Sequence, residues 1–414
     1  MAVIGFFSAL DSSNWLTNFS MHCYSLLISC NSNYFMLGWD HYVLIAVSRT
    51  PSSFCIKRLV STIPDIVDYS NFKFIGNLVL DQIYSFTCFL FLYKLYKRCV
   101  RFITGTTELH RICDCIVRSQ RLDHVIHVSP DSEESVSIAF ANTAVQHVHV
   151  LPELLHRVEH CIMYSSKLLL ARRDLEARQA SLERPLSKML ELKMFPHNAS
   201  ISTPQAIVLR ACMEKMLKSY LLMHFLNERA ATRFTALNPL HEKKLLEIWD
   251  VLSPDKPLSH RISLDWQQIG FQGQDPATDF RGMGVLALDD LYFLCKNRPK
   301  LARKLLITSQ SDLSWFPFAV AGINITSYTL RMVRTRLLQN TFYHHGINED
   351  TYHEVFCYIF EEFEKFWVNQ KELPTVLQFN AIMKEYQIKV ERELFQGKVL
   401  VLDPENPDLD KVEK

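Results

Sequence analysis

Glycine is scarce in this sequence, at 11 of 414 residues. This scarcity disfavours a turn-rich chain built of β-strands, and it excludes a collagen-like repeat. The sequence also has no alternating pattern of strand length and no internal repeat. It is rich instead in Leu, Glu, Lys and Phe, with apolar residues that recur at steps of three and four. We therefore predict an all-α protein, and at about 150 residues per domain its length predicts two to three folding units.

An excess of charge of either sign is also absent. Lys and Arg total 45 against 44 Asp and Glu, and the net charge of +1 argues against a nucleic-acid partner. Hydrophobic residues make up 48% and charged residues 21%, which excludes global disorder and a chain made mostly of membrane helices. The eleven cysteines are scattered along the chain. We therefore expect free buried thiols in a reducing compartment.

The N-terminal part lacks the marks of a targeting segment. No charged residue lies between Ser12 and Trp39, and no basic stretch precedes them. A secretory signal requires such a basic start, and a mitochondrial presequence requires arginines, of which the first here is Arg49. Residues 1–80 are therefore left as an unassigned extension.

The longest apolar run, FIGNLVLDQIYSFTCFLFLY at 74–93, contains one charge, Asp81. Four basic residues follow it: Lys94, Lys97, Arg98 and Arg101. The length permits a membrane span, but Asp81 near the bilayer interior would cost about 2.5–3.5 kcal/mol. We therefore predict that residues 81–105 form an interfacial anchor, in which aromatic side chains enter the lipid and the basic residues meet anionic headgroups. A membrane span and a helix docked on the protein itself are the alternatives.

A helical region is expected over residues 106–230, although residues 106–150 show no clear period and are predicted to be irregular. Beyond them the helical period is clear. Helices are predicted over 151–162, from about Pro204 to Asn227, from Asn238-Pro239 onward, over 352–369 and over 375–395. The pair Asn238-Pro239 combines a helix-capping residue with proline at the first helical position. Residues 399–414 are interpreted as a C-terminal tail.

One motif is typical of metal sites. His156-Arg157-Val158-Glu159-His160 fits the H-x-x-E-H pattern of inverted zinc peptidases, in which two histidines share a helix face and the glutamate acts as base. No third ligand can be named, and the apolar stripe of the same helix already explains the segment, so no metal site is predicted. The sequence contains no Walker A loop, no G-x-S-x-G elbow and no dinucleotide fingerprint. We expect no nucleotide site and no cofactor of the protein's own.

The most informative segment is WQQIGFQGQDPATDFRGMG, residues 266–284, which holds four of the eleven glycines. Asp275-Pro276 is expected to initiate a turn, and Asp279 is expected to cap a helix that starts near Phe280. Arg281 would then lie in the first helical turn, where a cation has the wrong sign for the helix dipole. Such an arginine needs a specific partner. An internal carboxylate, Asp275 or Asp279, is favoured on physical grounds over an anionic group of another molecule.

The segment resembles the signature of the ELMO domain. The resemblance continues through FPFAVAGINIT, FCYIFEEFEKFW and LQFNAIMKEY, and it covers about residues 235–398. A weaker similarity, through LYKRCVRFITGTTELHRIC, is to the short ELMO-domain-containing proteins, the ELMOD group. That group implies a GTPase-activating protein for Arf-family GTPases, including Arf-like ones, with the arginine of the DFRG segment as catalytic group. The scaffolding branch of the family, which pairs with Dock-type exchange factors, lacks this arginine.

The resemblance implies a role for each residue of the segment. Arg281 would be the catalytic group, and Mg²⁺ and GTP would be carried by the partner GTPase. GTPase contact or loop shaping is implied for Gly270, Gln272, Gly273, Asp275, Asp279, Gly282 and Gly284, with the last two glycines allowing close approach of the partner. The scaffold would be Trp266, Ile269 and Phe271. We expect Trp266 to be largely buried, because it precedes a glycine-rich loop that needs a rigid support. We expect a GTPase regulator in the cytoplasm, associated peripherally with an organelle membrane; the alternative is a non-catalytic adaptor that binds proteins through the same surface.

Overall fold

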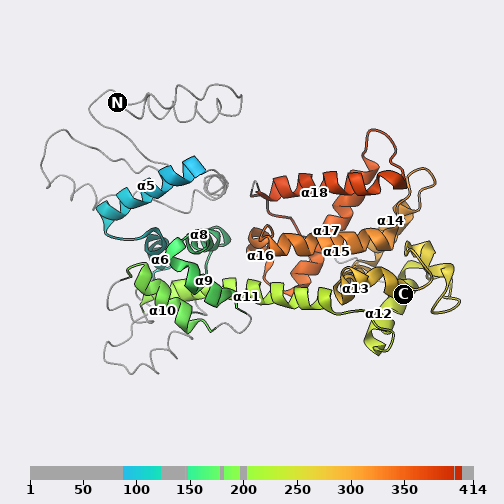
Figure 1. Cartoon of the computed structure of the whole chain (residues 1–414), viewed down its shortest axis with the longest axis horizontal. Coiled ribbons are helices and arrows are strands. Elements are labelled where there is room, and N and C mark those ends of the chain that lie inside the picture. The colour runs from blue at the N-terminus through green and yellow to red at the C-terminus, as the bar shows by residue number, and fades with distance from the viewer. Residues whose placement is uncertain are drawn as a thin grey trace, which may run out of the picture. The chain divides into compact units, whose positions relative to one another are not determined.

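The computed structural model describes residues 87–122, 145, 148–177, 181–195, 203–395 and 397–402. Its contacts divide the chain into one unit of residues 1–76 and 102–104 and a second unit of residues 77–101 and 105–414. The second unit contains all of the described residues except 102–104. Within the described ranges every regular element is a helix (Figure 1), which confirms the all-α prediction. The predictions for residues 1–80 lie outside these ranges, as do those for most of the C-terminal tail.

Within the described ranges the chain forms thirteen α-helices. In chain order the α-helices are α5 (Thr87–Thr104), α6 (Glu108–Ser119), α8 (Pro152–Met163), α9 (Leu169–Glu176), α10 (Glu183–Leu192), α11 (Pro204–Ala231), α12 (Pro239–Leu252), α13 (Gly284–Asn297), α14 (Pro299–Ser309), α15 (Phe318–Arg334), α16 (Gln339–His345), α17 (Glu349–Val368) and α18 (Phe379–Phe395). Four 3-10 helices interrupt them: η4 (Ser166–Leu168), η5 (Leu264–Ile269), η6 (Pro276–Arg281) and η7 (Val376–Gln378).

Helix starts follow the capping signals of the sequence. The Asn238 side chain accepts a hydrogen bond from the Leu240 N–H, with Pro239 at the first position of α12, as predicted. Thr203 caps α11 in the same way, by accepting from the Ala206 N–H. That helix runs on to Ala231, four residues beyond its predicted end.

The prediction that residues 106–150 are irregular is wrong for α6. Thr107 caps this helix by accepting from the His110 N–H, and Leu109, Ile112 and Ile116 lie on its buried face. Cys113 and Val117 are buried on the same face. The charged residues between them make the apolar period of this segment hard to recognise from the sequence alone.

Two hydrophobic cores lie in the second unit, and α11 contributes to both. The first core is built mainly from α6, α8, α9 and α10, and it includes Ile207 and Met213 of α11. The second is built from α12 to α18, and it includes Leu222 and Leu226 near the other end of α11. Figure 1 shows α11 as the long yellow-green helix that links the two groups.

Helix α13 is the centre of the second core, where it contacts α11, α12, α14, α15 and α17. Two consecutive carboxylates hold it. Asp289 accepts hydrogen bonds from Arg229 Nε of α11 (2.8 Å) and Lys244 Nζ of α12 (2.6 Å). Asp290 accepts from the Thr326 hydroxyl of α15 (2.7 Å), and His353 Nδ1 of α17 lies 2.7 Å from its other oxygen. The middle of α13 is therefore tied to four neighbouring helices.

The cysteines of the described ranges agree with the expected free thiols. Cys113, Cys161, Cys212, Cys295 and Cys357 are buried and form no disulfide. Burial raises the pKa of Cys161 and of Cys212 to about 12, so both thiols stay protonated at neutral pH.

No helix within the described ranges is long and apolar enough to cross a membrane. Of the apolar run at 74–93, residues 74–86 lie outside those ranges. The basic residues that follow the run belong to α5, which has four basic and no acidic residues.

Candidate functional site

The segment that carries Arg281 forms two short 3-10 helices before α13 begins. Helix η6 starts at Asp275, whose side chain accepts from the Ala277 N–H (3.0 Å), with Pro276 at its first position. The prediction that Asp279 caps a helix from near Phe280 is therefore wrong, because Asp275-Pro276 already starts a helical turn and α13 begins only at Gly284.

Arg281 is consequently the last residue of η6 and does not lie in the first turn of a helix. A cation at the C-terminal end of a helix has the favourable sign for its dipole, so the electrostatic mismatch expected from the sequence does not exist. The side chain is exposed, and its Nε donates a hydrogen bond to the Thr278 carbonyl oxygen (2.8 Å). This bond fixes the stem of the side chain against its own helix.

The two carboxylates proposed as internal partners of Arg281 are engaged elsewhere. Asp275 pairs with Arg261 Nη1 (3.0 Å), and Asp279 accepts from the Gln272 N–H (2.9 Å). Burial raises the pKa of Asp279, and this outweighs the lowering by the Gln272 bond and by the charge of Arg281. Among the residues that the structure describes, Arg281 forms no ion pair.

Arg261 organises the segment, and sequence reasoning missed it. Its Nε lies 2.6 Å from Glu242 of α12, its Nη1 binds Asp275, and its carbonyl oxygen accepts from Trp266 Nε1 (2.9 Å). Burial lowers the pKa of Arg261, but its bonds with the two carboxylates outweigh this and leave the pKa raised. Arg261 thus connects η6 to α12. No local sequence pattern predicts this role, because Glu242 lies 19 residues away from Arg261.

Aromatic side chains form the floor under the segment. Trp266 is fully buried, as expected, and packs edge-on against Trp249 and Phe271 at ring distances of 5.4 and 5.8 Å. Phe280 lies 5.7 Å from Phe271 and is also buried. Ile269 is buried beside them. Since Phe280 precedes Arg281 directly, the floor fixes the backbone from which the arginine projects.

Two glycines of the segment are needed for close packing inside the protein. Gly270 has φ +84°, and a Cβ there would lie 2.2 Å from the backbone nitrogen of Phe318. Gly284 has φ +53°, and a Cβ there would lie 2.2 Å from the Thr232 carbonyl oxygen at the end of α11. The expectation that Gly284 lets a partner approach is therefore wrong. Gly273 and Gly282 have open space where a Cβ would stand, so the exposed Gly282 is the glycine that leaves room beside Arg281.

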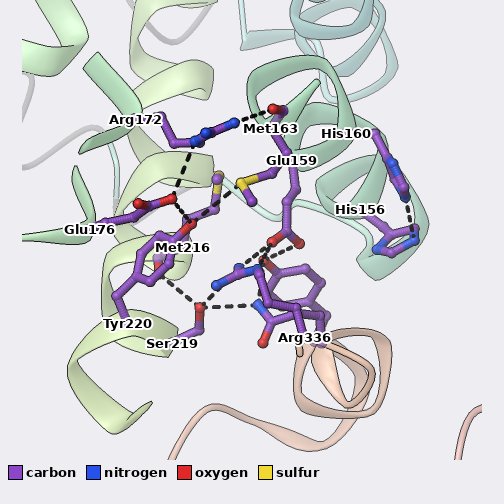
Figure 2. A network of polar contacts seen from close by, with 12 residues as sticks. His156, Glu159, His160, Met163, Arg172, Glu176, Met216, Ser219, Tyr220 and Arg336 are labelled. Carbon is purple, nitrogen blue, oxygen red and sulfur yellow. Dashed lines mark hydrogen bonds and ion pairs between the residues drawn. The ribbon is translucent and has the colours of Figure 1, made fainter. Parts of the chain in front are cut away.

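In the part of the chain that the structure describes, the side chains of the H-x-x-E-H motif make two separate sets of contacts. Nε2 of His156 lies 2.9 Å from Nε2 of His160, a hydrogen bond between the two rings. Glu159 turns away from them, accepts from the Tyr343 hydroxyl (2.8 Å) and pairs with Arg336 (Figure 2). No group of three or more potential metal-binding side chains occurs within the described ranges.

Arg336 is the centre of the network in Figure 2. Its Nε donates to Glu159 (2.7 Å), and its guanidinium lies over the Tyr220 ring at 4.3 Å. Burial raises the pKa of Glu159, but Arg336 and His156 outweigh this and leave it lowered. Arg336 has φ +62°, a conformation that costs energy for any residue with a side chain. Arg336 follows α15, and its contacts with Glu159 of α8 and Tyr220 of α11 join the second core to the first.

The four basic residues predicted to meet a membrane lie in α5, but the structure separates their roles. Lys94 and Arg98 are exposed. Lys97 forms an ion pair with Glu108 (2.5 Å), and Arg101 donates to the sulfur of Met194. Two of the four are therefore bound to the protein itself.

The sequence is similar to that of a known protein family and to several of its members. The family model described as the ELMO/CED-12 family matches residues 224–383, which contain η5, η6 and α13. ELMO domain-containing protein 2 of Mus musculus is 30% identical over 238 residues, which cover 57% of this chain and 80% of that protein. ELMO domain-containing protein B of Dictyostelium discoideum is 29% identical over 307 residues (73% and 95%). ELMO domain-containing protein 1 of Mus musculus is 26% identical over 346 residues (78% and 92%).

Proposed function

Because the chain belongs to the ELMO/CED-12 family, we propose that it is a GTPase-activating protein for Arf or Arf-like small GTPases. In this proposal Arg281 is the catalytic group, supplied in trans to the nucleotide of the partner. The protein needs no cofactor of its own, because the GTPase carries Mg²⁺ and GTP.

The observation that carries the proposal is the state of Arg281. The side chain is exposed, its stem is held by the Thr278 carbonyl oxygen, and the nearby carboxylates are occupied by other partners. Its terminal nitrogens make no hydrogen bond to residues of the described ranges. An arginine of this kind is positioned in advance and keeps its charge for a group that another molecule brings.

The chemistry follows from the charge of phosphoryl transfer. A small GTPase positions its nucleotide, but negative charge on the transferring phosphoryl oxygens is incompletely neutralised. An arginine supplied in trans stabilises that charge and raises the rate by about 10³–10⁵. Lysine would be a poor substitute, because a guanidinium reaches two oxygens with fixed geometry and an ammonium group does not.

Exposed apolar side chains on the segments bonded to η6 support a protein partner. Leu237 is 93%, Leu240 68% and Ile262 60% exposed. The segment of Leu237 and Leu240 contacts η6 through the stacked rings of Phe234 and Phe280. Ile262 follows Arg261, which binds Asp275. We propose that these residues contact the GTPase around Arg281.

We further propose that the protein acts from the cytoplasmic side of an organelle membrane, with which it associates peripherally. The basic helix α5 supports this.

The test is single-turnover hydrolysis of GTP by several purified Arf and Arf-like GTPases, with and without the full chain. Arg281→Ala and Arg281→Lys should both lose the stimulation, about 10³-fold or more. Arg303→Ala is the matched control, because Arg303 is also exposed and also donates its Nε to a backbone carbonyl oxygen, that of Val251. The control should keep full stimulation.

Thermal unfolding distinguishes catalysis from structure. Removal of the Arg281 side chain costs one exposed hydrogen bond, at most about 0.5–1.5 kcal/mol, so the melting temperature should hardly change. Full stimulation by Arg281→Ala would refute the catalytic role. An inactive wild-type chain that still binds the GTPase would favour the adaptor instead.

A further inference from the structure

Helix α5 exposes one continuous stripe of apolar and basic side chains. Phe91 is 67% and Leu95 48% exposed, and Lys94 and Arg98 are exposed as well. These four positions follow the spacing i, i+3, i+4 and i+7, which places them along one face of an α-helix. The stripe therefore presents two apolar side chains with a cation beside each.

The opposite face of α5 is fixed to the protein. Tyr93 is buried, and its hydroxyl donates to Glu108 Oε1 (2.5 Å). Lys97 pairs with the other oxygen of Glu108 (2.5 Å) and lies over the Tyr93 ring at 4.3 Å. Val100 is buried on the same side. The helix cannot rotate to bury Phe91 and Leu95 without breaking these contacts.

Glu108 makes this orientation stable. Burial raises the pKa of its carboxyl group, but the charges of Lys97 and Arg157 outweigh this, and the pKa falls to about 2. The carboxylate is therefore ionised at any physiological pH, and Lys97 stays bound to it. This separates Lys97 from Lys94 and Arg98, which form no ion pair with residues of the described ranges.

We infer that the stripe Phe91–Lys94–Leu95–Arg98 is a lipid contact that lays α5 on the surface of an anionic membrane. The proposal deepens the peripheral membrane association put forward above, and it does not depend on Arg281. Charge complementarity favours lipid: α5 contains four basic residues and no acidic one. Phe and Leu enter the boundary of the acyl chains, while the long stems of Lys94 and Arg98 let their charges reach the headgroups.

The experiment is co-sedimentation of the full chain with vesicles of pure phosphatidylcholine and with vesicles of phosphatidylcholine and phosphatidylserine in equal parts. The wild type should bind the anionic vesicles more strongly. Lys94→Glu/Arg98→Glu should lose at least about thirtyfold in partitioning to anionic vesicles, because each cation near such a surface contributes roughly a fivefold factor. Phe91→Ser/Leu95→Ser should lose about tenfold or more on both vesicle types.

The matched control is Lys371→Glu/Lys384→Glu, two exposed lysines whose reversal gives the same change in net charge. It should bind like the wild type. All variants should keep the wild-type melting temperature and the wild-type stimulation of a soluble, truncated GTPase without vesicles, so failure of the lipid contact is separable from failure of the GTPase-activating role. Equal loss in the control, no loss in the stripe variants, or no binding by the wild type would overturn the proposal.

Discussion

Replacement of Arg336 should destabilise the protein strongly, although this residue lies outside the candidate site. Arg336→Ala removes the cation from the buried carboxylate of Glu159, whose side chain is 5% exposed. The carboxylate would keep the hydrogen bond from Tyr343 but lose its charge partner. Breaking a buried ion pair from one side costs about 3–5 kcal/mol. Such a loss in free energy of unfolding lowers the melting temperature by about 6–20 °C.

Three companion variants make the reasoning specific. Arg336→Gly should be less destabilised than Arg336→Ala by about 1 kcal/mol, because glycine adopts φ +62° without cost and alanine does not. Adding Glu159→Gln to Arg336→Ala should recover part of the loss, since the unpaired buried charge is gone. Arg336→Lys should fall between wild type and Arg336→Ala.

The pH dependence of the protein's stability tests the same ion pair, Arg336 with Glu159. The pKa of Glu159 is lowered in the folded state, so the unfolded chain binds more protons as pH falls below the ordinary value of 4.5. The stabilisation is present above that pH and is lost as pH falls through the lowered pKa. Urea unfolding followed by circular dichroism should therefore show a difference between wild type and Glu159→Gln that shrinks in acid. A melting shift below about 2 °C for Arg336→Ala, with no recovery by Glu159→Gln, would refute the argument.

Two further predictions concern the candidate site. Trp266→Ala should cost about 3–5 kcal/mol in unfolding free energy, as for other large-to-small changes in a core, and an unchanged urea midpoint would contradict the role of Trp266 as floor of the segment. Gly284→Ala should lower the melting temperature and the stimulation of GTP hydrolysis, because its Cβ would lie 2.2 Å from the Thr232 carbonyl oxygen. Gly282→Ala is the paired control with open space at the Cβ, and it should keep the wild-type melting temperature; equal behaviour of the two variants would show that α13 does not depend on this close approach.

The sequence predicts those elements whose position depends only on residues next to them in the chain. The start of α12 was predictable because Asn238 and Pro239 act on the turn that follows them directly. The burial of Trp266 was predictable from the glycine-rich segment beside it. The partners of Asp275, Glu108 and Glu159 were not, because each ion pair joins segments whose approach depends on the packing of whole helices.

The same limit explains the error at η6. Asp275 and Asp279 are both competent caps, and the sequence does not show which one the chain uses. The choice is made by Arg261, which holds Asp275, and by Gly284, whose contact with Thr232 sets where α13 begins. Glu242 of α12 holds Arg261, and Thr232 directly follows α11, so both influences depend on residues outside the segment.

The adjacent carboxylates Asp289 and Asp290 limit how the length of this part of the chain can change. Successive residues of an α-helix are rotated by about 100°, so a single inserted or deleted residue between Gly284 and Asp289 would turn both side chains away from their partners on neighbouring helices. Substitutions at the exposed positions of η6 leave that register intact. The exposed positions of η6 should thus accept changes of residue type far more readily than the interval from Arg281 to Asp290 accepts changes of length. The spacing of Arg281 from the core is therefore set by contacts of Asp289 and Asp290, in which the arginine takes no part.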